Sequence, residues 1–282
     1  MIILSNRALI SLSGSDRKSF LQGLISNDVN KVSENNAIYA VMLSPQGRFL
    51  YDFFIIQFQD RLLLDCNRGK MEEIIKKLSV YKLRANVQIA KEENMVVGAI
   101  IPPCDDVRSQ LEQQNIVNFV DPRSDKLGIR IIALQPQLAN PHLKPEASID
   151  LYNSCRINLK IADDSDLTFD HSLILEYGFD HINAIDYKKG CYVGQEVTAR
   201  THYRGLIRKT IYLIAIDNLK EIALGSKITC DNKNIGIILS SVFYEDKLKA
   251  LALIKDIDSD NQKIDLSNAD LFIDQQKITL IN

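Results

Sequence analysis

The sequence lacks the paired cysteine and histidine motifs that mark common metal sites and disulfide frameworks. Its 282 residues include five cysteines, none in a C-x-x-C pair, and four histidines without an H-x-x-x-H pair. An odd number of unpaired cysteines argues against a disulfide framework, a zinc ribbon and a locally ligated iron–sulfur cluster. We therefore expect no dedicated metal site in this chain.

Long apolar runs and glycine-rich phosphate loops are also missing. No segment approaches 18 uninterrupted apolar residues, and residues 1–7 contain neither a basic region nor a long apolar stretch. We accordingly expect no membrane partner, and a reducing, cytoplasmic setting. Neither a Gly-x-Gly-x-x-Gly nor a Walker pattern occurs, so a Rossmann or P-loop fold is poorly supported.

Charge of either sign is not in excess. The 34 Lys and Arg and 36 Asp and Glu give a net charge of −2, with a pI near 6.1. We expect no direct DNA binding, and any anion site has to come from a local patch. With 46% hydrophobic residues, the chain can build one large domain or two to three smaller ones.

Short β-branched and aromatic stretches predict an α+β fold with mostly antiparallel sheets and flanking helices. Strands are expected at 7–13, 38–43, 49–58, 61–66, 86–90, 95–101, 116–120 and 128–134, and helices at 16–25, 70–80, 105–114 and 149–159. From 208 onward, short strands separated by turns predict a small antiparallel barrel or sandwich. We place the domains at 1–205 and 206–282.

The segment Lys188–Glu196 gathers the largest number of chemically special side chains. Neighbouring lysines favour the thiolate form of Cys191, and a helix opened by Gly194 would add free N–H groups. Gln195 and Glu196 offer donors and acceptors suited to a heterocyclic ring. The alternative is a glycine turn with a packed, inert cysteine.

Six Lys or Arg side chains face a single acid across residues 187–209. This run, which includes Arg200, is either a solvated basic face or a patch for an anion: a polyglutamate tail, a phosphate or RNA. Two carboxylates elsewhere are further candidates. Asp28 is either a helix-end turn residue or a ligand contact, and Asp52 either faces outward from its apolar strand or lines a pocket.

Five segments together resemble one known family. They are residues 20–29, 44–48 with 51–52, 81–84, 121–123 with 127–128, and 189–196, in that order along the chain. Residues 189–196 resemble the signature of the YgfZ-type folate-binding proteins, which are relatives of the glycine cleavage T-protein, an aminomethyltransferase. The resemblance covers most of the chain, and its cysteine motif is specific.

This resemblance implies a ring of three domains around a folate pocket, with a C-terminal barrel. It implies a tetrahydrofolate-binding accessory protein that supports the biogenesis or maintenance of iron–sulfur enzymes, including tRNA-modifying ones, as clients. Cys191 would be the reactive residue. The residues lining the pocket or its mouth would be Lys189, Gly190, Gln195, Glu196 and Arg200, with Asp28 and Asp52 as further candidates.

The sequence departs from the T-protein pattern in two places. Tyr51 stands where the aminomethyltransferases carry the first of two aspartates, and Lys160 stands where a glycine is usual. Loss of one carboxylate argues against aminomethyl transfer, so we expect no classical enzyme. Folate-dependent aminomethyl transfer and a folate-binding scaffold with an inert Cys191 remain the alternatives.

Overall fold

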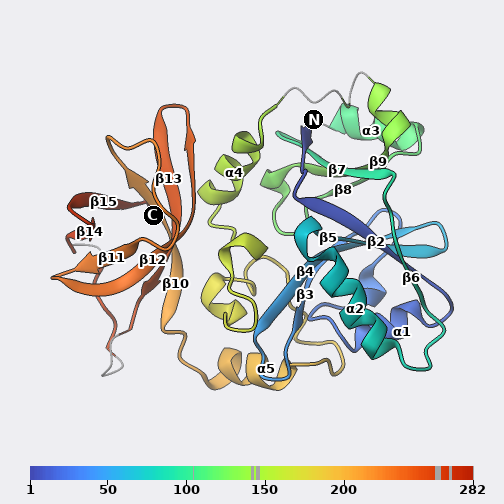
Figure 1. Ribbon diagram of the computed structural model, residues 1–282, viewed down its shortest axis with the longest axis horizontal. Coiled ribbons are helices and arrows are strands. Elements are labelled where there is room, and N and C mark those ends of the chain that lie inside the picture. The colour runs from blue at the N-terminus through green and yellow to red at the C-terminus, as the bar shows by residue number, and fades with distance from the viewer. Residues whose placement is uncertain (104, 141–142, 144–146, 258–261, 267–268, 282) are drawn as a thin grey trace.

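The computed structural model describes residues 1–103, 105–140, 143, 147–257, 262–266 and 269–281, and folds into two open sheets and a barrel (Figure 1). The two sheets occupy the N-terminal region, and the barrel lies on the opposite side of helix α4 (Ile149–Asn158). Among the described residues, no helix combines the length and the apolar character needed to cross a bilayer.

The first sheet has five antiparallel strands in the order β3-β4-β5-β2-β6. Its members are β2 (Arg7–Ser13), β3 (Ile38–Leu43), β4 (Phe49–Phe58), β5 (Arg61–Asn67) and β6 (Gln88–Lys91). Both faces are apolar because both are covered. Ile74 and Leu78 of α2 (Met71–Lys82) pack on one face with Leu21 of α1 (Arg17–Gln22), and the other face joins the central core.

The second sheet has four antiparallel strands in the order β1-β7-β9-β8. They are β1 (Ile2–Ile3), β7 (Met95–Ile100), β8 (Val117–Val120) and β9 (Ile129–Leu134), and α3 (Asp105–Gln113) precedes β8. Leu127 and Ile132 of this part enter the same core as Tyr39 and Phe54 of the first sheet. The two sheets are therefore joined by one continuous apolar core.

The C-terminal strands close into a six-stranded antiparallel barrel in the order β10-β13-β12-β11-β14-β15. Its strands are β10 (Lys209–Ile216), β11 (Lys227–Cys230), β12 (Lys233–Tyr244), β13 (Lys247–Lys255), β14 (Leu271–Ile273) and β15 (Gln276–Ile281). On the inward face of β13, small Ala250 and Ala252 stand between Leu248 and Ile254, which fits a narrow barrel interior. Helix α5 (Gln195–Arg204) lies just before this barrel.

The predicted fold class is confirmed: antiparallel sheets with flanking helices precede a closed barrel. Two local predictions are wrong. Helix α1 ends at Gln22 and not at Ile25, because Ile25 forms a β-bridge with Met42 and the Ser26 N–H donates to the Val41 carbonyl. The acidic run 162–166, whose charge and lack of EF-hand spacing predict a solvated loop, instead has Asp166 buried.

Candidate functional site

Lys189 anchors the loop that carries Cys191 to the end of α1. The buried Lys189 ammonium donates hydrogen bonds to the carbonyls of Gln22, Ile25 and Asn27 at 2.7, 2.6 and 2.9 Å. These carbonyls lie at the end of α1, where a helix leaves such groups unpaired and favours a cation. Burial lowers the pKa of Lys189 to about 8, against the raising effect of Asp28 and Asp186. The Lys189 ammonium therefore ties the loop to the end of α1.

Two interlocked turns fix the other side of the loop. Gly194 has φ +82° and N-caps α5, as the sequence predicted for a helix start, and Gly47 in the β3–β4 turn has φ +73°. A Cβ on Gly194 would lie 2.5 Å from the Ser44 carbonyl oxygen, and one on Gly47 would lie 2.8 Å from Val197. Neither turn can accept a side chain, so the loop, α5 and the β3–β4 turn form one rigid unit.

Cys191 projects from this rigid unit into solvent. Its residue is exposed, and a Cβ on the preceding Gly190 would touch nothing within 4 Å. Among the other described cysteines, Cys66 is buried and Cys155 and Cys230 are half-buried, while Cys104 lies outside the described residues. Burial raises the pKa of Cys66 to about 12 and is also the first cause of the raised pKa values of Cys155 and Cys230. Cys191 is thus the accessible thiol of the described chain.

The remaining residues of the motif follow Cys191 in α5, and Asp28 lies in the turn after α1. Gln195 and Glu196 form the first turn of α5, and Arg200 is exposed one turn further on. Asp28 caps the short turn after α1 by accepting from the Asn30 N–H, and it also accepts from the Gln22 amide, each at 2.9 Å. The pocket-lining roles predicted for these residues, and for Lys189 and Gly190, stay predictions.

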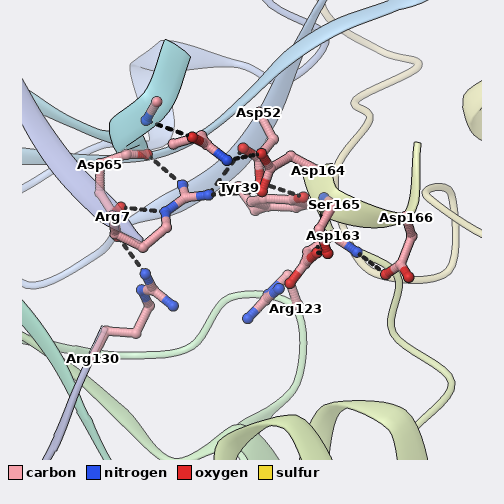
Figure 2. A network of polar contacts seen from close by, with 12 residues as sticks. Arg7, Tyr39, Asp52, Asp65, Arg123, Arg130, Asp163, Asp164, Ser165 and Asp166 are labelled. Atoms are coloured by element: carbon pink, nitrogen blue, oxygen red, sulfur yellow. Dashed lines mark hydrogen bonds and ion pairs between the residues drawn. The ribbon is translucent and has the colours of Figure 1, made fainter. Parts of the chain in front are cut away.

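Asp52 lies elsewhere, in a buried polar network at the centre of the N-terminal region (Figure 2). Arg7 donates to Asp52 at 3.0 Å and to Asp65 at 2.7 Å, and the Tyr39 hydroxyl donates to Asp52 at 2.9 Å. Arg130 binds the second oxygen of Asp65. Asp52 therefore faces inward, and its carboxylate is held by an arginine of β2.

A second arginine pair extends this network toward α4. Arg123 forms a fork with Asp121 and also donates to the Tyr152 hydroxyl at 2.6 Å, to which Arg130 donates at 3.1 Å. The guanidinium groups of Arg130 and Arg123 lie 3.7 and 4.7 Å from the centre of the Phe54 ring. Sequence reasoning missed these arginines. A charged residue inside an apolar strand drew attention to Asp52. The same pattern occurs at Asp65 and Arg130 and could have identified the network.

Asp164 closes the network on the side of a small cavity. The cavity of about 60 Å³ is bordered by Asp52, Asp164, Asn67 and Lys70 together with aromatic and aliphatic residues. It is far smaller than the roughly 300–1,000 Å³ that ligand pockets span. Burial raises the pKa of Asp164 to about 7, the Asp52 carboxylate adds to this, and Arg7 at 3.7 Å opposes it.

This shifted carboxyl predicts a pH-dependent stability. Because the folded-state pKa of Asp164 lies above the ordinary value of 3.8, its contribution is complete below about pH 4 and is lost as pH rises through about 7. The wild-type free energy of unfolding should fall relative to that of Asp164→Asn over this range, by at most roughly 1.4 kcal/mol per pH unit. Urea unfolding of both proteins across the range measures this, and parallel pH profiles would refute it.

A larger hollow opens where the N-terminal region meets the barrel. Its volume is about 460 Å³, and its walls combine apolar residues with three groups that are cationic or can become so: Arg123, Lys160 and His181. The apolar lining consists of Leu159, Ile161, Leu175, Ile182, Ile207 and Ile211. Ligand pockets commonly have this size, this mixture of apolar walls with a few polar groups, and a position between two parts of a protein.

The fold of this chain is shared with a solved structure. The fold matches glycine cleavage system aminomethyltransferase T from Bartonella henselae with a TM-score of 0.74 and 14% identity, over the whole chain and 84% of that protein. The chain therefore has the fold of that aminomethyltransferase. A scan against protein-family models gives no match.

Sequence relatives carry a different name. The chain is 30% identical over 257 residues to the mitochondrial iron–sulfur cluster assembly factor IBA57 homolog of Dictyostelium discoideum, and 31% over 237 residues to the mouse factor. These matches take in 77% and 76% of this chain and 62% and 65% of those relatives. The Neurospora crassa homolog is 32% identical over 74% of this chain and 52% of its own length. The chain thus spans less than two thirds of these relatives.

The predicted cytoplasmic setting is contradicted by these relatives, which are all named as mitochondrial. The prediction rested on free cysteines and on the lack of long apolar runs. Those features report a reducing aqueous environment, and more than one compartment provides it. Composition of the folded region therefore carries no information on which of these compartments holds the protein.

Proposed function

We propose that this protein is an accessory factor in the assembly or maintenance of iron–sulfur enzymes, with Cys191 as its working thiol. The observation that carries the proposal is the exposed Cys191 on a loop fixed by Lys189 and Gly194. A rigid, accessible thiol is suited to meet a partner in one orientation. The names of the relatives at about 30% identity support the same role.

The chemistry asked of Cys191 is ligation of iron in a cluster that passes through as cargo. Thiolates are the usual protein ligands of such clusters, and the thiolate rather than the thiol binds. An exposed Cys191 can supply one such ligand to a cluster that another protein delivers or receives. Iron–sulfur enzymes, including those that modify tRNA, are the proposed clients.

Replacing Cys191 with serine should abolish cluster handling and leave the fold intact, because the thiol makes no buried contact. The test is anaerobic transfer of a [2Fe–2S] cluster from a glutathione-ligated donor, followed by visible absorption and circular dichroism. Cys230→Ser, which changes a half-buried thiol of the barrel, is the matched control and should behave as wild type. Equal cluster signals from Cys191→Ser and wild type would refute the role of this thiol.

Folate binding is a second proposal. It is favoured by the hollow beside Arg123, which is lined by none of the residues that the sequence predicted for the pocket. Its volume of about 460 Å³ lies within the usual range for ligand pockets, unlike the cavity beside Asp52. Tetrahydrofolate combines a ring system with a carboxylate tail, which match isoleucine walls, the Lys160 ammonium and the polar His181 side chain. Lys160, the departure from the T-protein pattern, would then be a ligand contact.

Calorimetric titration with tetrahydrofolate tests this second proposal. Saturable binding to wild type should weaken about tenfold or more in Lys160→Glu, since a carboxylate would then face the ligand tail. Lys126→Glu, an equal charge change at another exposed lysine, should leave the affinity unchanged. An absence of binding, or equal loss in both variants, would contradict the assignment.

Aminomethyl transfer is less well supported than either proposal. The remaining carboxylate of that motif, Asp52, is ion-paired with Arg7 and accepts from Tyr39. A carboxylate so engaged is not free to act on a folate amine, and the adjoining cavity of about 60 Å³ leaves no room for the substrate.

A further inference from the structure

The exposed side of α5 carries charged and aromatic groups that the Cys191 loop does not use. We call this the α5 surface, and define it by Lys188, Arg200, His202, Tyr203, Arg204 and Leu206, all of which are exposed. Helix α5 begins four residues after Cys191 and is about 15 Å long. A partner that covers the α5 surface therefore also reaches the thiol.

The aromatic part of this surface is held in a fixed arrangement. His202 stacks on Tyr187 with ring centres 4.0 Å apart, and Tyr203 meets both rings edge-on at 4.9 and 5.9 Å. Tyr203 is nevertheless 68% exposed. A large ring that is fixed by its neighbours and open to solvent loses little entropy on binding, as in the anchors of protein interfaces.

Leu206 provides a second apolar group beside the ring. A Cβ on Gly205 would lie 2.7 Å from the backbone of Thr201, so only glycine permits this tight exit from the helix. Leu206 follows directly and is 51% exposed. Two solvent-facing apolar side chains thus stand at the end of α5.

Three cations of the α5 surface have no acidic partner among the described residues. In the part of the chain that the structure describes, no ion pair joins Lys188, Arg200 or Arg204 to an acid, whereas nearby Lys209 pairs with Glu176. The exposed acid of the helix is Glu196 in its first turn. Apolar anchors within a rim of unpaired arginines match the composition of a protein-binding site for an acidic surface.

We propose that the α5 surface docks an acidic protein that delivers or receives the cluster, and so brings that protein to Cys191. Tyr203 and Leu206 would enter apolar sites on the partner, and Arg200 and Arg204 would meet its carboxylates. This inference rests on the proposed function, because it names the partner chemistry of the same thiol.

RNA is less well supported as the occupant, because Tyr187 and His202 each use one ring face against the other, which leaves fewer faces for stacking on bases.

The test uses the apo form of an acidic plant-type [2Fe–2S] ferredoxin as the probe, with affinity measured by biolayer interferometry at low and moderate salt. The Arg200→Glu/Arg204→Glu variant should bind about tenfold or more weakly than wild type and lose most of the salt dependence. Tyr203→Ser should weaken binding and keep the salt dependence. The control, Lys227→Glu/Lys233→Glu on exposed barrel residues, makes the same net-charge change and should bind as wild type.

Several outcomes would overturn the inference: no binding of the probe to wild type, equal loss in the control pair, or tighter binding of a single-stranded RNA that the α5 variant abolishes. The apo probe separates this inference from the proposed function. The variants could bind the probe with the predicted order of affinities while cluster transfer does not depend on Cys191. That result would refute the proposed function alone.

Discussion

Replacing Arg7 with methionine is expected to lower the free energy of unfolding by roughly 3–5 kcal/mol, because it leaves buried carboxylates without their cation. Arg7 pairs with Asp52 and Asp65 and lies 3.7 Å from Asp164. Burial by itself would lower the pKa of Arg7, and these carboxylates hold it well above the usual value. Urea unfolding followed by circular dichroism measures the loss.

Arg61→Met is the matched control for this prediction. Arg61 lies on the neighbouring strand β5 and pairs with Glu92 at a site where its side chain is 28% exposed. An ion pair so exposed contributes about 0–1 kcal/mol. Arg7→Lys keeps the charge and cannot reach both aspartates in the same way, so its free energy of unfolding should fall by an intermediate amount. This variant provides the test if Arg7→Met does not fold. Similar losses for Arg7→Met and Arg61→Met would contradict the network's role.

Gly194→Ala should cost about 2–4 kcal/mol and displace the loop that carries Cys191. The new Cβ would lie 2.5 Å from the Ser44 carbonyl oxygen and 2.8 Å from the Leu43 side chain, at a residue with φ +82°. Alanine pays a steric penalty in this left-handed region even without a contact. Thermal unfolding gives the stability change, and the rate of Cys191 alkylation reports the loop.

Gly190→Ala is the control within the same motif. A Cβ there meets nothing within 4 Å, so the free energy of unfolding should change by no more than about 0.5 kcal/mol. We expect a large difference in stability between the alanine variants of these two glycines on either side of Cys191. Equal effects would mean that the turn at Gly194 does not hold the loop.

Local pattern was sufficient for most of the fold. β2, β3 and β4 begin and end where alternation and turn residues predicted, and the barrel follows from short strands with regular turns. The end of α1 could not be predicted, because Ile25 leaves the helix to bridge Met42 in another strand. Tertiary pairing overrides local helix preference at such a point.

The site could be predicted only in part, because several of its contacts join segments that are distant in the sequence. Motif spacing drew attention to Cys191 and Gly194, whose roles depend on neighbours in sequence. Lys189 was noticed for its charge, but its acceptors lie more than 160 residues away, at the end of α1. The partners of Asp52 are likewise set by strand order, since Arg7 lies 45 residues earlier. A charge in an apolar strand indicates that a partner exists and does not identify it.

The measurement that tests the central claim most directly is the activity of iron–sulfur enzymes in cells of the source organism whose only copy of this protein carries Cys191→Ser. Several cluster-dependent enzymes would be assayed beside enzymes without clusters, with Cys230→Ser as the control strain. We predict that cluster-dependent activities fall in the Cys191→Ser strain alone, at unchanged levels of the protein. Normal activities in that strain would contradict the account of Cys191 as a working thiol in iron–sulfur assembly.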